Sequence, residues 1–439
     1  MSLDALARKF NDKPLYIVGG AVRNMLLGVK AHDIDITSSM RADDVIAMLD
    51  GSDFKVVPSS LRMGTLIIRD GKNKYEYTAF RKDSYRANSG EHQPVEVSFT
   101  DDINIDAMRR DFTVNAIYYN ILTGEYIDPL HGMDDIKKRI LRTTREPESV
   151  FAEDGLRLLR LVRFASQLGF SIEPHCYEVA RSLIHLLGDI SVERIEEEFS
   201  KILVADISGY GNTYGYYKGV KMLIDLGAMD YIIPELMAGK GVEQNHIYHK
   251  YDVLTQEVEA LRYAHESVRL EALIHDIGKP YALKADGNMY NHAEVGATIA
   301  RKALARLRYP NKVIDEVSRL VELHMFNMDG KASPYKVKKF IIDNHDVIDK
   351  FMYIRYADVM ASKNAMESYT RMAEALEEMR NARVPMSIRE LKVNGNDVKK
   401  LGVNPAEIGN VLQSILYDVA INGLPNTRED ILKKIRGGE

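Results

Sequence analysis

The spacing of apolar residues changes at about residue 150, and this change limits the folds open to the chain. Before it, short apolar runs bounded by turn residues predict strands at 15–18, 33–36, 65–68, 74–78 and 115–120. After it, residues such as Leu156, Leu159 and Val162 recur at helical spacing, and glycine and proline punctuate the pattern. The sequence therefore predicts a multidomain α+β protein, with a mixed sheet in an N-terminal head and helices elsewhere.

The length of 439 residues exceeds what a single core of ordinary size holds, so several modules are expected. Breaks in the helical pattern fall at Tyr210–Gly219 and at Val384-Pro385. The predicted parts are a head, a helical neck, a second helical region, and a body with a tail, over residues 1–145, 146–207, 208–360 and 361–439.

Cysteine content, charge and hydropathy exclude several classes of protein. The single cysteine, Cys176, rules out a disulfide within the chain and a zinc site built from cysteines. A net charge of −5 argues against a uniformly basic nucleic-acid binder but allows a local basic groove. No stretch approaches 18 uninterrupted apolar residues, and the N-terminus lacks an apolar targeting segment. We therefore expect a cytoplasmic protein with no membrane partner and no disulfide partner.

Two aspartates, Asp33 and Asp35, alternate with Ile34 and Ile36 on a predicted strand. A side-chain period of two places both carboxylates on one face of the strand and both isoleucines on the other. Adjacent carboxylates repel each other unless a divalent cation neutralises them. Two Mg²⁺ ions held in this way activate an attacking 3′-hydroxyl and stabilise a departing pyrophosphate. The alternative is an exposed strand carrying two solvated acids.

A glycine turn, Gly19-Gly20, precedes this strand and leads into a helix that carries Arg23. Such a turn lets backbone N–H groups approach a triphosphate, and the arginine adds positive charge. The combination G-G-A-V-R-N and H-D-I-D-I-T resembles the tRNA nucleotidyltransferase and bacterial poly(A) polymerase branch of the DNA polymerase β-like superfamily. The resemblance implies a third carboxylate in a Y-E-V-T-T-F-like run, which here is Glu76. It makes Asp33, Asp35 and Glu76 the expected catalytic residues, with Asp33 and Asp35 holding Mg²⁺.

The segment Arg109–Ala116 resembles the R-R-D-F-T-x-N-A signature of the same family. In the family this segment holds the ribose of the incoming nucleotide. Without the neighbouring motifs it would be an ordinary salt-bridged surface turn. The two motifs together imply nucleotide-binding roles for Gly19, Gly20, Arg23, Arg110, Asp111 and Asn115.

The segment Glu153–Arg160 resembles the E-D-x-x-R motif of class II enzymes. On one helix, Asp154 and Arg157 would be three residues apart and could reach the same ligand. A carboxylate accepts from the exocyclic amine of cytosine or adenine, whereas guanine and uracil oppose it with a carbonyl. We expect Asp154 and Arg157 to choose the base, and Arg160 and Arg163 to contact phosphates. The alternative is a helix N-terminus with ordinary charge placement.

The run His275-Asp276-Ile277-Gly278-Lys279 resembles an HD domain, a helical fold of metal-dependent phosphohydrolases. The residues that could hold a further divalent metal there are His275, Asp276, His292, His324 and Asp358. The family usually has a histidine where this chain has Gln256, and an amide is a much weaker ligand than imidazole. The sequence therefore favours a structural relic over an active hydrolase.

The resemblance covers essentially the whole chain and implies template-independent addition of CCA to tRNA 3′ ends from CTP and ATP, with the helical parts binding the acceptor and T arms. Two alternatives are closely related functions: a partial enzyme that adds only CC or only A, and a bacterial poly(A) polymerase. An alternative from a different class is an HD-type phosphohydrolase or nucleotide sensor. A non-catalytic RNA-binding protein is a further alternative. The interval Arg81–Phe99 is long enough for the flexible loop that CC-adding enzymes lack.

Overall fold

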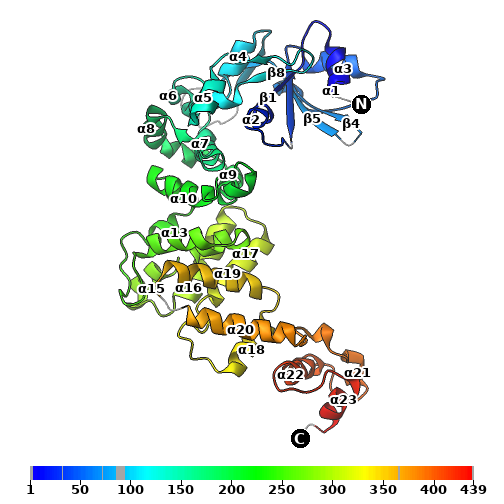
Figure 1. Ribbon diagram of the computed structural model, residues 1–439, viewed down its shortest axis with the longest axis vertical. Helices are drawn as coiled ribbons and strands as arrows, with labels where there is room; N and C mark the ends of the chain where they lie inside the picture. Colours follow the sequence, from blue (N-terminus) through cyan, green and yellow to red (C-terminus); the bar gives the residue numbers. More distant parts are fainter. Residues whose placement is uncertain (1–2, 32, 72, 86–93, 364–365, 438–439) are drawn as a thin grey trace. The chain divides into compact units, whose positions relative to one another are not determined.

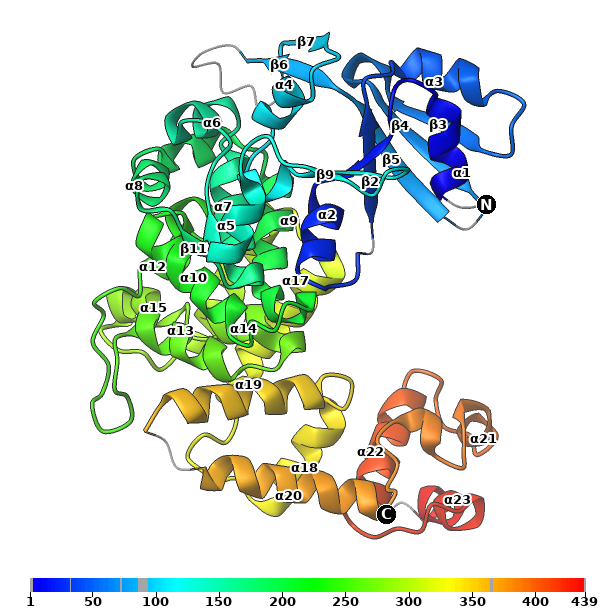
Figure 2. The same cartoon turned by 45° about the horizontal axis from the view of Figure 1, so that its top comes forward.

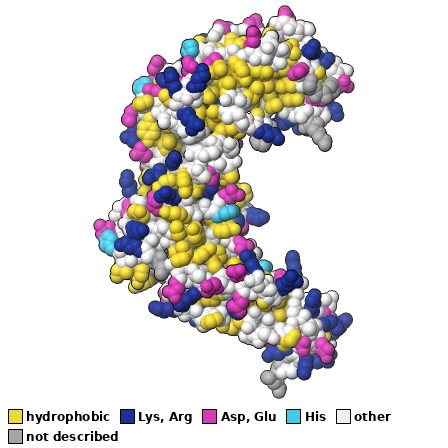
Figure 3. Space-filling model, in the orientation of Figure 1, with side chains coloured by type: hydrophobic (Ala, Val, Ile, Leu, Met, Phe, Trp, Pro, Cys, Tyr) yellow, Lys and Arg dark blue, Asp and Glu magenta, His cyan; other side chains and the backbone are white. Residues whose placement is uncertain are grey.

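The computed structural model describes residues 3–31, 33–71, 73–85, 94–363 and 366–437. It divides into two compact units, Met1–Pro234 and Glu235–Glu439 (Figure 1). The first unit contains the large sheet and the second is helical, so the predicted fold class is confirmed. None of the helices in the described ranges is long and apolar enough to cross a membrane. On the face drawn in Figure 3, basic and acidic side chains are interspersed in both units.

The large sheet of the first unit is mixed and has seven strands in the order β3-β4-β5-β2-β1-β8-β9. The strands are β1 (Tyr16–Val18), β2 (Ile34–Ser38), β3 (Lys55–Ser60), β4 (Thr65–Asp70), β5 (Asn73–Ala79), β8 (Tyr118–Asn120) and β9 (Tyr126–Ile127). Four of the predicted strands are confirmed to within a few residues. The edge strand β3 escaped prediction because Pro58 interrupts its pattern, and proline is tolerated only at such an edge.

The predicted strand at 115–120 is wrong in its first half. Residues Thr113–Asn115 form the short 3₁₀ helix η3, and β8 begins only at Tyr118. The reason is a polar side chain: the Asn115 amide donates to Asp111 and its oxygen accepts from Arg23, which draws this residue into a turn. Local hydrogen bonding of this kind competes with a β-ladder.

The strands β2 and β5 are parallel neighbours, and their register positions the acidic residues. Asp35 lies opposite Glu76, and Ile36 lies opposite Tyr77. Ile36 and Tyr77 are buried beneath the sheet, so the alternation of side chains turns Asp35 and Glu76 to the other face. Helix α2 (Gly20–Leu26) packs against β1 and β2 (Figure 2).

A hairpin of β6 (Arg81–Ser84) and β7 (Glu96–Phe99) occupies the interval in which a flexible loop was predicted. Residues 86–93 of that loop lie outside the described residues. The helix α4 (Ile103–Met108) follows, and its N-terminus is capped by the side chain of Asp102.

Helices complete the first unit: α6 (Pro147–Glu153), α7 (Leu156–Leu168), α8 (Pro174–Ser182), α9 (Val192–Leu203) and α10 (Gly215–Leu226). Three of them, α7, α9 and α10, pack together. The close approach depends on Gly219, because a Cβ there would lie 2.4 Å from Ser166 Oγ and 2.6 Å from Ile202 Cγ2. A two-strand parallel ladder, β10 (Ile140–Leu141) with β11 (Ser171–Ile172), links α7 to the preceding segment.

The second unit is helical in its described residues, from α13 (Val253–Tyr263) to α23 (Arg428–Arg436). A continuous apolar core runs through α18 (Pro334–Asp343), α19 (Ile348–Ala361), α20 (Glu367–Asn381) and α22 (Ile408–Ala420). Further helices are α14 (Arg269–Ile274), α16 (His292–Arg306) and α17 (Asn311–Leu323). Gly278 lets the turn after α14 touch α16, because a Cβ there would lie 2.0 Å from the His292 carbonyl oxygen.

A buried glutamate, Glu271 on α14, should make the stability of the second unit depend on pH. Burial raises the pKa of Glu271 to about 7, and Glu316 adds to the effect while Lys350 opposes it. Because the folded state binds the proton more tightly than the unfolded state, this contribution to stability is complete below pH 4.5 and is lost as the pH rises through 7. We expect Glu271→Gln to raise the free energy of unfolding at pH 8 by about 1–3 kcal/mol, with little change near pH 4.5.

Urea unfolding of wild type and variant at both pH values tests this prediction. The exposed Glu374→Gln is the matched control and should change neither curve. A Glu271→Gln variant that is no more stable than wild type at pH 8 would contradict the assignment.

Candidate functional site

Three carboxylates lie on the two central strands β2 and β5 or next to them: Asp33 directly precedes β2, Asp35 lies within it, and Glu76 lies opposite Asp35 on β5. All three side chains are exposed. Partial desolvation raises the pKa of Asp35, the negative charges of Glu76 and Asp33 raise it further, and Arg110 and Arg160 act in the opposite direction. An all-oxygen set of mutually repelling carboxylates fits the ligand preference of Mg²⁺.

The glycine turn lies directly against this cluster. Gly19 has a φ of 74°, which favours glycine, and a Cβ there would lie 3.5 Å from Asp35 Oδ2 and 3.9 Å from Arg110 Nη1. A side chain at this position would fill the space between the carboxylate and the arginine. The structure therefore brings Gly19, Asp35 and Arg110 together.

A buried hydrogen-bond network joins four of the predicted nucleotide-binding residues. Arg23 Nη1 donates to Asn115 Oδ1 (2.5 Å), and Asn115 Nδ2 donates to Asp111 Oδ1 (3.1 Å). Asp111 Oδ2 accepts from Arg160 Nε (2.9 Å) and Nη2 (2.5 Å). Burial alone would raise the pKa of Asp111, but the pair with Arg160 holds it at about 2, so the network is charged at neutral pH.

Two residues that the sequence analysis did not identify, Asp106 and Tyr118, hold the Arg110 side chain in place. Its Nη2 pairs with Asp106 Oδ2 (3.0 Å), and its Nε donates to the Tyr118 hydroxyl (3.2 Å). Asp106 also accepts from Arg109 Nε (2.8 Å), and although burial opposes ionisation, the two guanidinium groups hold its pKa at about 2. The spacing of Asp106 to Arg109 (i, i+3) and to Arg110 (i, i+4) could have indicated these ion pairs from the sequence.

Three guanidinium groups surround the ring of Phe164 on α7. Those of Arg163, Arg23 and Arg160 lie 4.3, 5.0 and 5.3 Å from the ring centroid. Arg163 Nε also pairs with Glu198 on α9 at 2.8 Å. The convergence of cations next to three carboxylates suits a ligand that carries several negative charges and a metal.

The predicted helix spacing of Asp154 and Arg157 is wrong, because Asp154 lies in the break between α6 and α7 with an extended backbone. Its Oδ1 accepts from the Leu156 N–H (3.1 Å) and caps α7, and its Oδ2 pairs with Arg194 (3.1 Å). The Arg157 guanidinium donates to the carbonyl oxygens of Arg109 and Val150 and to Glu153. The carboxylate withdraws from the helix because capping satisfies a backbone donor that otherwise has no partner.

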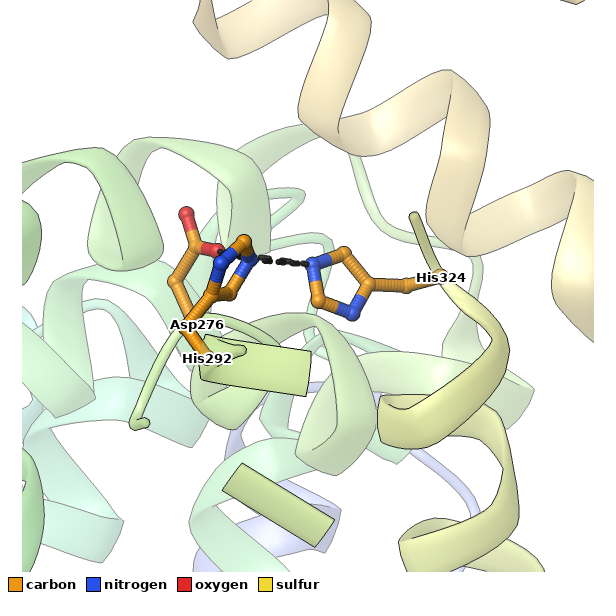
Figure 4. A group of neighbouring side chains, drawn as sticks. All are labelled: Asp276, His292 and His324. Carbon is orange, nitrogen blue, oxygen red and sulfur yellow. Dashed lines mark hydrogen bonds and ion pairs between the residues drawn. The ribbon is translucent and has the colours of Figure 1, made fainter. Parts of the chain in front are cut away.

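A second cluster, in the second unit, gathers the predicted HD residues. Asp276 Oδ1 lies 3.2 Å from His292 Nε2 and 3.4 Å from His324 Nε2, and the two Nε2 atoms are 3.2 Å apart (Figure 4). On the other side, His275 Nε2 lies 3.3 Å from Asp276 Oδ2 and 3.5 Å from Asp358 Oδ1. All five predicted residues are buried and adjacent.

Two residues outside the predicted set complete this cluster. Gln256 Nε2 donates to Asp358 Oδ1 at 3.4 Å, and Lys279 Nζ lies 2.6 Å from Asp276 Oδ2. A cavity of about 740 Å³ opens onto Asp276, His292 and Asp358, and His249 also lines it. The cavity wall carries cations as well, including Lys279 and Arg371.

Comparison with known families agrees with this organisation. Residues 15–142 match the poly A polymerase head domain, residues 169–239 match the probable RNA and SrmB-binding site of polymerase A, and residues 245–366 match the HD domain. Two curated CCA-adding enzymes, from Anoxybacillus flavithermus and Oceanobacillus iheyensis, are 38% and 36% identical. The chain spans about half the length of these two relatives, 53% and 52%. The CCA-adding enzyme of Streptococcus pneumoniae is 27% identical over 96% of this chain and 92% of its own.

Solved structures share the fold. The Bacillus stearothermophilus CCA-adding enzyme in complex with CTP has a TM-score of 0.67 at 24% identity, covering 98% of this chain and 95% of its own. The Thermotoga maritima CCA-adding enzyme complexed with tRNA has a TM-score of 0.64 at 19% identity, covering 99% and 94%. Residues 15–142 of the first unit therefore form a head domain of the poly A polymerase type. The chain as a whole is similar in sequence and fold to CCA-adding enzymes, and residues 245–366 of its second unit match the HD domain.

Tyr210, in the loop after η5 (Ala205–Ser208), should act on the nucleotide site through Arg23. Its hydroxyl accepts from Arg23 Nη2 (3.0 Å) and donates to Asn24 Oδ1 (2.5 Å). We expect Tyr210→Phe to raise the KM for nucleotide by about 3- to 30-fold with a smaller change in kcat, because a hydrogen bond to a charged group is lost. Steady-state kinetics measures this, with the exposed Tyr214→Phe as control. An unchanged KM would show that Tyr210 only packs.

Proposed function

We propose that the protein adds CCA to the 3′ ends of tRNA, using CTP and ATP and releasing pyrophosphate. The observation that carries the proposal is the register that sets Asp35 beside Glu76, next to Gly19 and Arg110. Its relatives are CCA-adding enzymes, and solved structures of the same fold were determined with CTP, ATP and tRNA.

Each group of residues has a distinct part in the proposed reaction. Asp33 and Asp35 would hold two Mg²⁺ ions, which supply activation of the 3′-hydroxyl and charge neutralisation at the leaving pyrophosphate. The backbone N–H groups at Gly19 and Gly20 bind the triphosphate. Arg110, fixed by Asp106 and Tyr118, orients it. The charged network from Arg23 to Arg160 holds these groups in place before the nucleotide arrives, which lowers the entropic cost of transfer.

Base selection is proposed for Asp154 and Arg157. Asp154 is anchored at the start of α7 by its cap hydrogen bond, so its carboxylate has a defined position. Arg157 is 7% exposed and fixed by three protein acceptors, which gives it the rigidity that discrimination between bases requires. In this proposal the carboxylate accepts from an amino group and opposes the carbonyl of guanine or uracil.

Two close alternatives differ only in what is added. A CC-adding or A-adding enzyme and a poly(A) polymerase would use the same carboxylates and network. The β6–β7 hairpin, which occupies the interval of the predicted flexible loop, favours complete CCA addition. Incubation with tRNA that lacks its 3′ end, together with CTP or ATP singly and then both, separates the three.

Replacing either aspartate of the metal site should abolish nucleotide addition while tRNA binding persists. We expect Asp33→Asn and Asp35→Asn to lower kcat at least about 100-fold, because the lost groups act in the transition state. Single-turnover extension of tRNA measures the rate, and a filter-binding assay measures tRNA affinity. The exposed Asp53→Asn is the matched control. Rates like those of wild type in either variant would refute the two-metal site.

A sharper prediction concerns the choice of base. The amide oxygen of Asp154→Asn can still cap Leu156 N–H, but its NH₂ group donates where the carboxylate accepted. We expect kcat/KM for CTP and ATP to fall about 10- to 100-fold, and the use of UTP or GTP relative to CTP to rise. Arg194→Gln breaks the ion pair but keeps the carboxylate, so it should keep the CTP to UTP ratio. An unchanged ratio in Asp154→Asn would leave Asp154 as a helix cap only.

A second candidate function is hydrolysis of a phosphate ester at the HD domain. The observation that favours it is the buried cluster of Asp276, His292 and His324 at the wall of a 740 Å³ cavity that also carries Lys279. We propose that a divalent metal binds at this cluster. Gln256 stands where the family usually has histidine, so the activity of the domain depends on which ligands remain.

A further inference from the structure

Two guanidinium groups meet the C-terminal end of α4 at consecutive backbone carbonyl groups. Arg145 Nε donates to the Met108 carbonyl oxygen (2.8 Å), and Arg157 Nη2 donates to that of Arg109 (2.9 Å). The last carbonyl groups of a helix have no partner within the helix, and here side-chain donors satisfy them. Arg145 lies in the segment between β10 and α6, so it reaches the helix end from a different part of the chain than Arg157 on α7.

A single carboxylate oxygen joins these two arginines. Glu153 Oε2 accepts from Arg145 Nη2 (2.6 Å) and from Arg157 Nη1 (3.0 Å). The side chains of Arg145 and Glu153 are 32% and 20% exposed, so their ion pair is partly shielded from solvent. Hydrogen bonds between charged groups are stronger than those between neutral groups. Loss of Arg145 would remove one of the two cations that hold the Glu153 carboxylate and leave its orientation less constrained.

The contacts of Arg157 show why the orientation of Glu153 matters. Arg157 donates to Glu153 and to two backbone carbonyl oxygens, those of Val150 and Arg109. A guanidinium group carries five N–H donors in one plane, so these three bonds determine which of its edges faces a ligand. The two carbonyl groups belong to α6 and to the end of α4, whose backbones fix their positions. Glu153 is the acceptor that can rotate, and Arg145 restrains it.

The residue before Arg145 extends the same contact toward the nucleotide-binding network. Thr144 Oγ1 donates to the Arg110 carbonyl oxygen (2.6 Å), and the Thr144 N–H donates to the Asp111 carbonyl oxygen (3.2 Å). Arg110 and Asp111 are the residues proposed above to orient the triphosphate and to anchor the charged network. The dipeptide Thr144-Arg145 therefore contacts the end of α4, the start of that network, and the carboxylate beside the base-selecting arginine.

We propose that Arg145 is a positioning residue for base selection, because it holds the Glu153 carboxylate that orients Arg157. The inference rests on the proposed function, in which Arg157 and Asp154 select the base of the incoming nucleotide. A base with the wrong hydrogen-bonding pattern is rejected only while the selecting donors stay in place. Once Glu153 is free to rotate, Arg157 can shift to meet the carbonyl groups of uracil or guanine. Discrimination then falls more than the rate of correct addition.

The variant Arg145→Gln tests this role, with kcat/KM measured for CTP and for UTP on tRNA that lacks CCA. We expect the ratio of CTP to UTP to fall about 3- to 30-fold, while kcat for CTP changes by less than about threefold. Arg145→Lys keeps a cation for Glu153 but lacks the planar group that also reaches Met108, so its ratio should be intermediate. Arg142→Gln is the matched control, because it breaks an ion pair of the same segment, with Asp135 at 3.4 Å, and should keep the wild-type ratio.

A double-mutant cycle separates positioning from a general loss of structure. In a Glu153→Ala background the carboxylate is absent, so adding Arg145→Gln should change the ratio by less than about twofold. Full additivity of the two changes would overturn the proposal. An equal fall in kcat/KM for both nucleotides, with a lower melting temperature, would also overturn it, since Arg145 would then be structural only.

The same measurements distinguish failure of this inference from failure of the proposed function. An unchanged CTP to UTP ratio in Arg145→Gln, together with an altered ratio in Asp154→Asn, would overturn the role of Arg145 and leave base selection intact. A wild-type protein that adds neither CTP nor ATP to tRNA would overturn the proposed function and this inference with it.

Discussion

The parallel pairing of β2 with β5 is the interaction on which the head depends. It sets two carboxylates, Asp35 and Glu76, directly opposite each other, an arrangement that repels in the absence of a counter-charge. The opposite face of the same pair buries Ile36 and Tyr77, and that apolar contact holds the register. A slip of one residue would turn the carboxylates into the core, so the hydrophobic alternation fixes the site as firmly as it fixes the fold.

Arginines compensate the concentrated negative charge, and acidic residues in turn hold the arginines. Arg110 is paired by Asp106, Arg160 by Asp111 and Arg163 by Glu198, each at 3.0 Å or less. The pair of Arg160 with Asp111 links α7 to the segment between α4 and η3, and the pair of Arg163 with Glu198 links α7 to α9. The sheet domain and the helices that follow it therefore share one electrostatic network. A loosened pair would displace a guanidinium group and leave a buried charge without its partner, which is far more costly than the loss of a surface ion pair.

Much of the site could be predicted from sequence because its residues belong to short contiguous patterns. The alternation at residues 33–36 identified the two aspartates as candidate site residues, and the glycine turn before this strand identified Gly19. The errors have a common cause, since Asn115 and Asp154 both leave regular structure to make side-chain hydrogen bonds that local periodicity does not encode. Tyr210 escaped prediction because its partner Arg23 lies 187 residues away in the sequence.

The carboxylate cluster of the head and the His/Asp cluster of the HD domain differ in the chemistry of their donors. The head offers only carboxylate oxygens, which suit a hard ion that keeps its waters and binds phosphate oxygens. The HD domain offers two buried imidazoles and one carboxylate, with each histidine oriented by a backbone carbonyl, a set that retains softer ions more tightly. The difference in donor types separates the two proposed metal sites chemically.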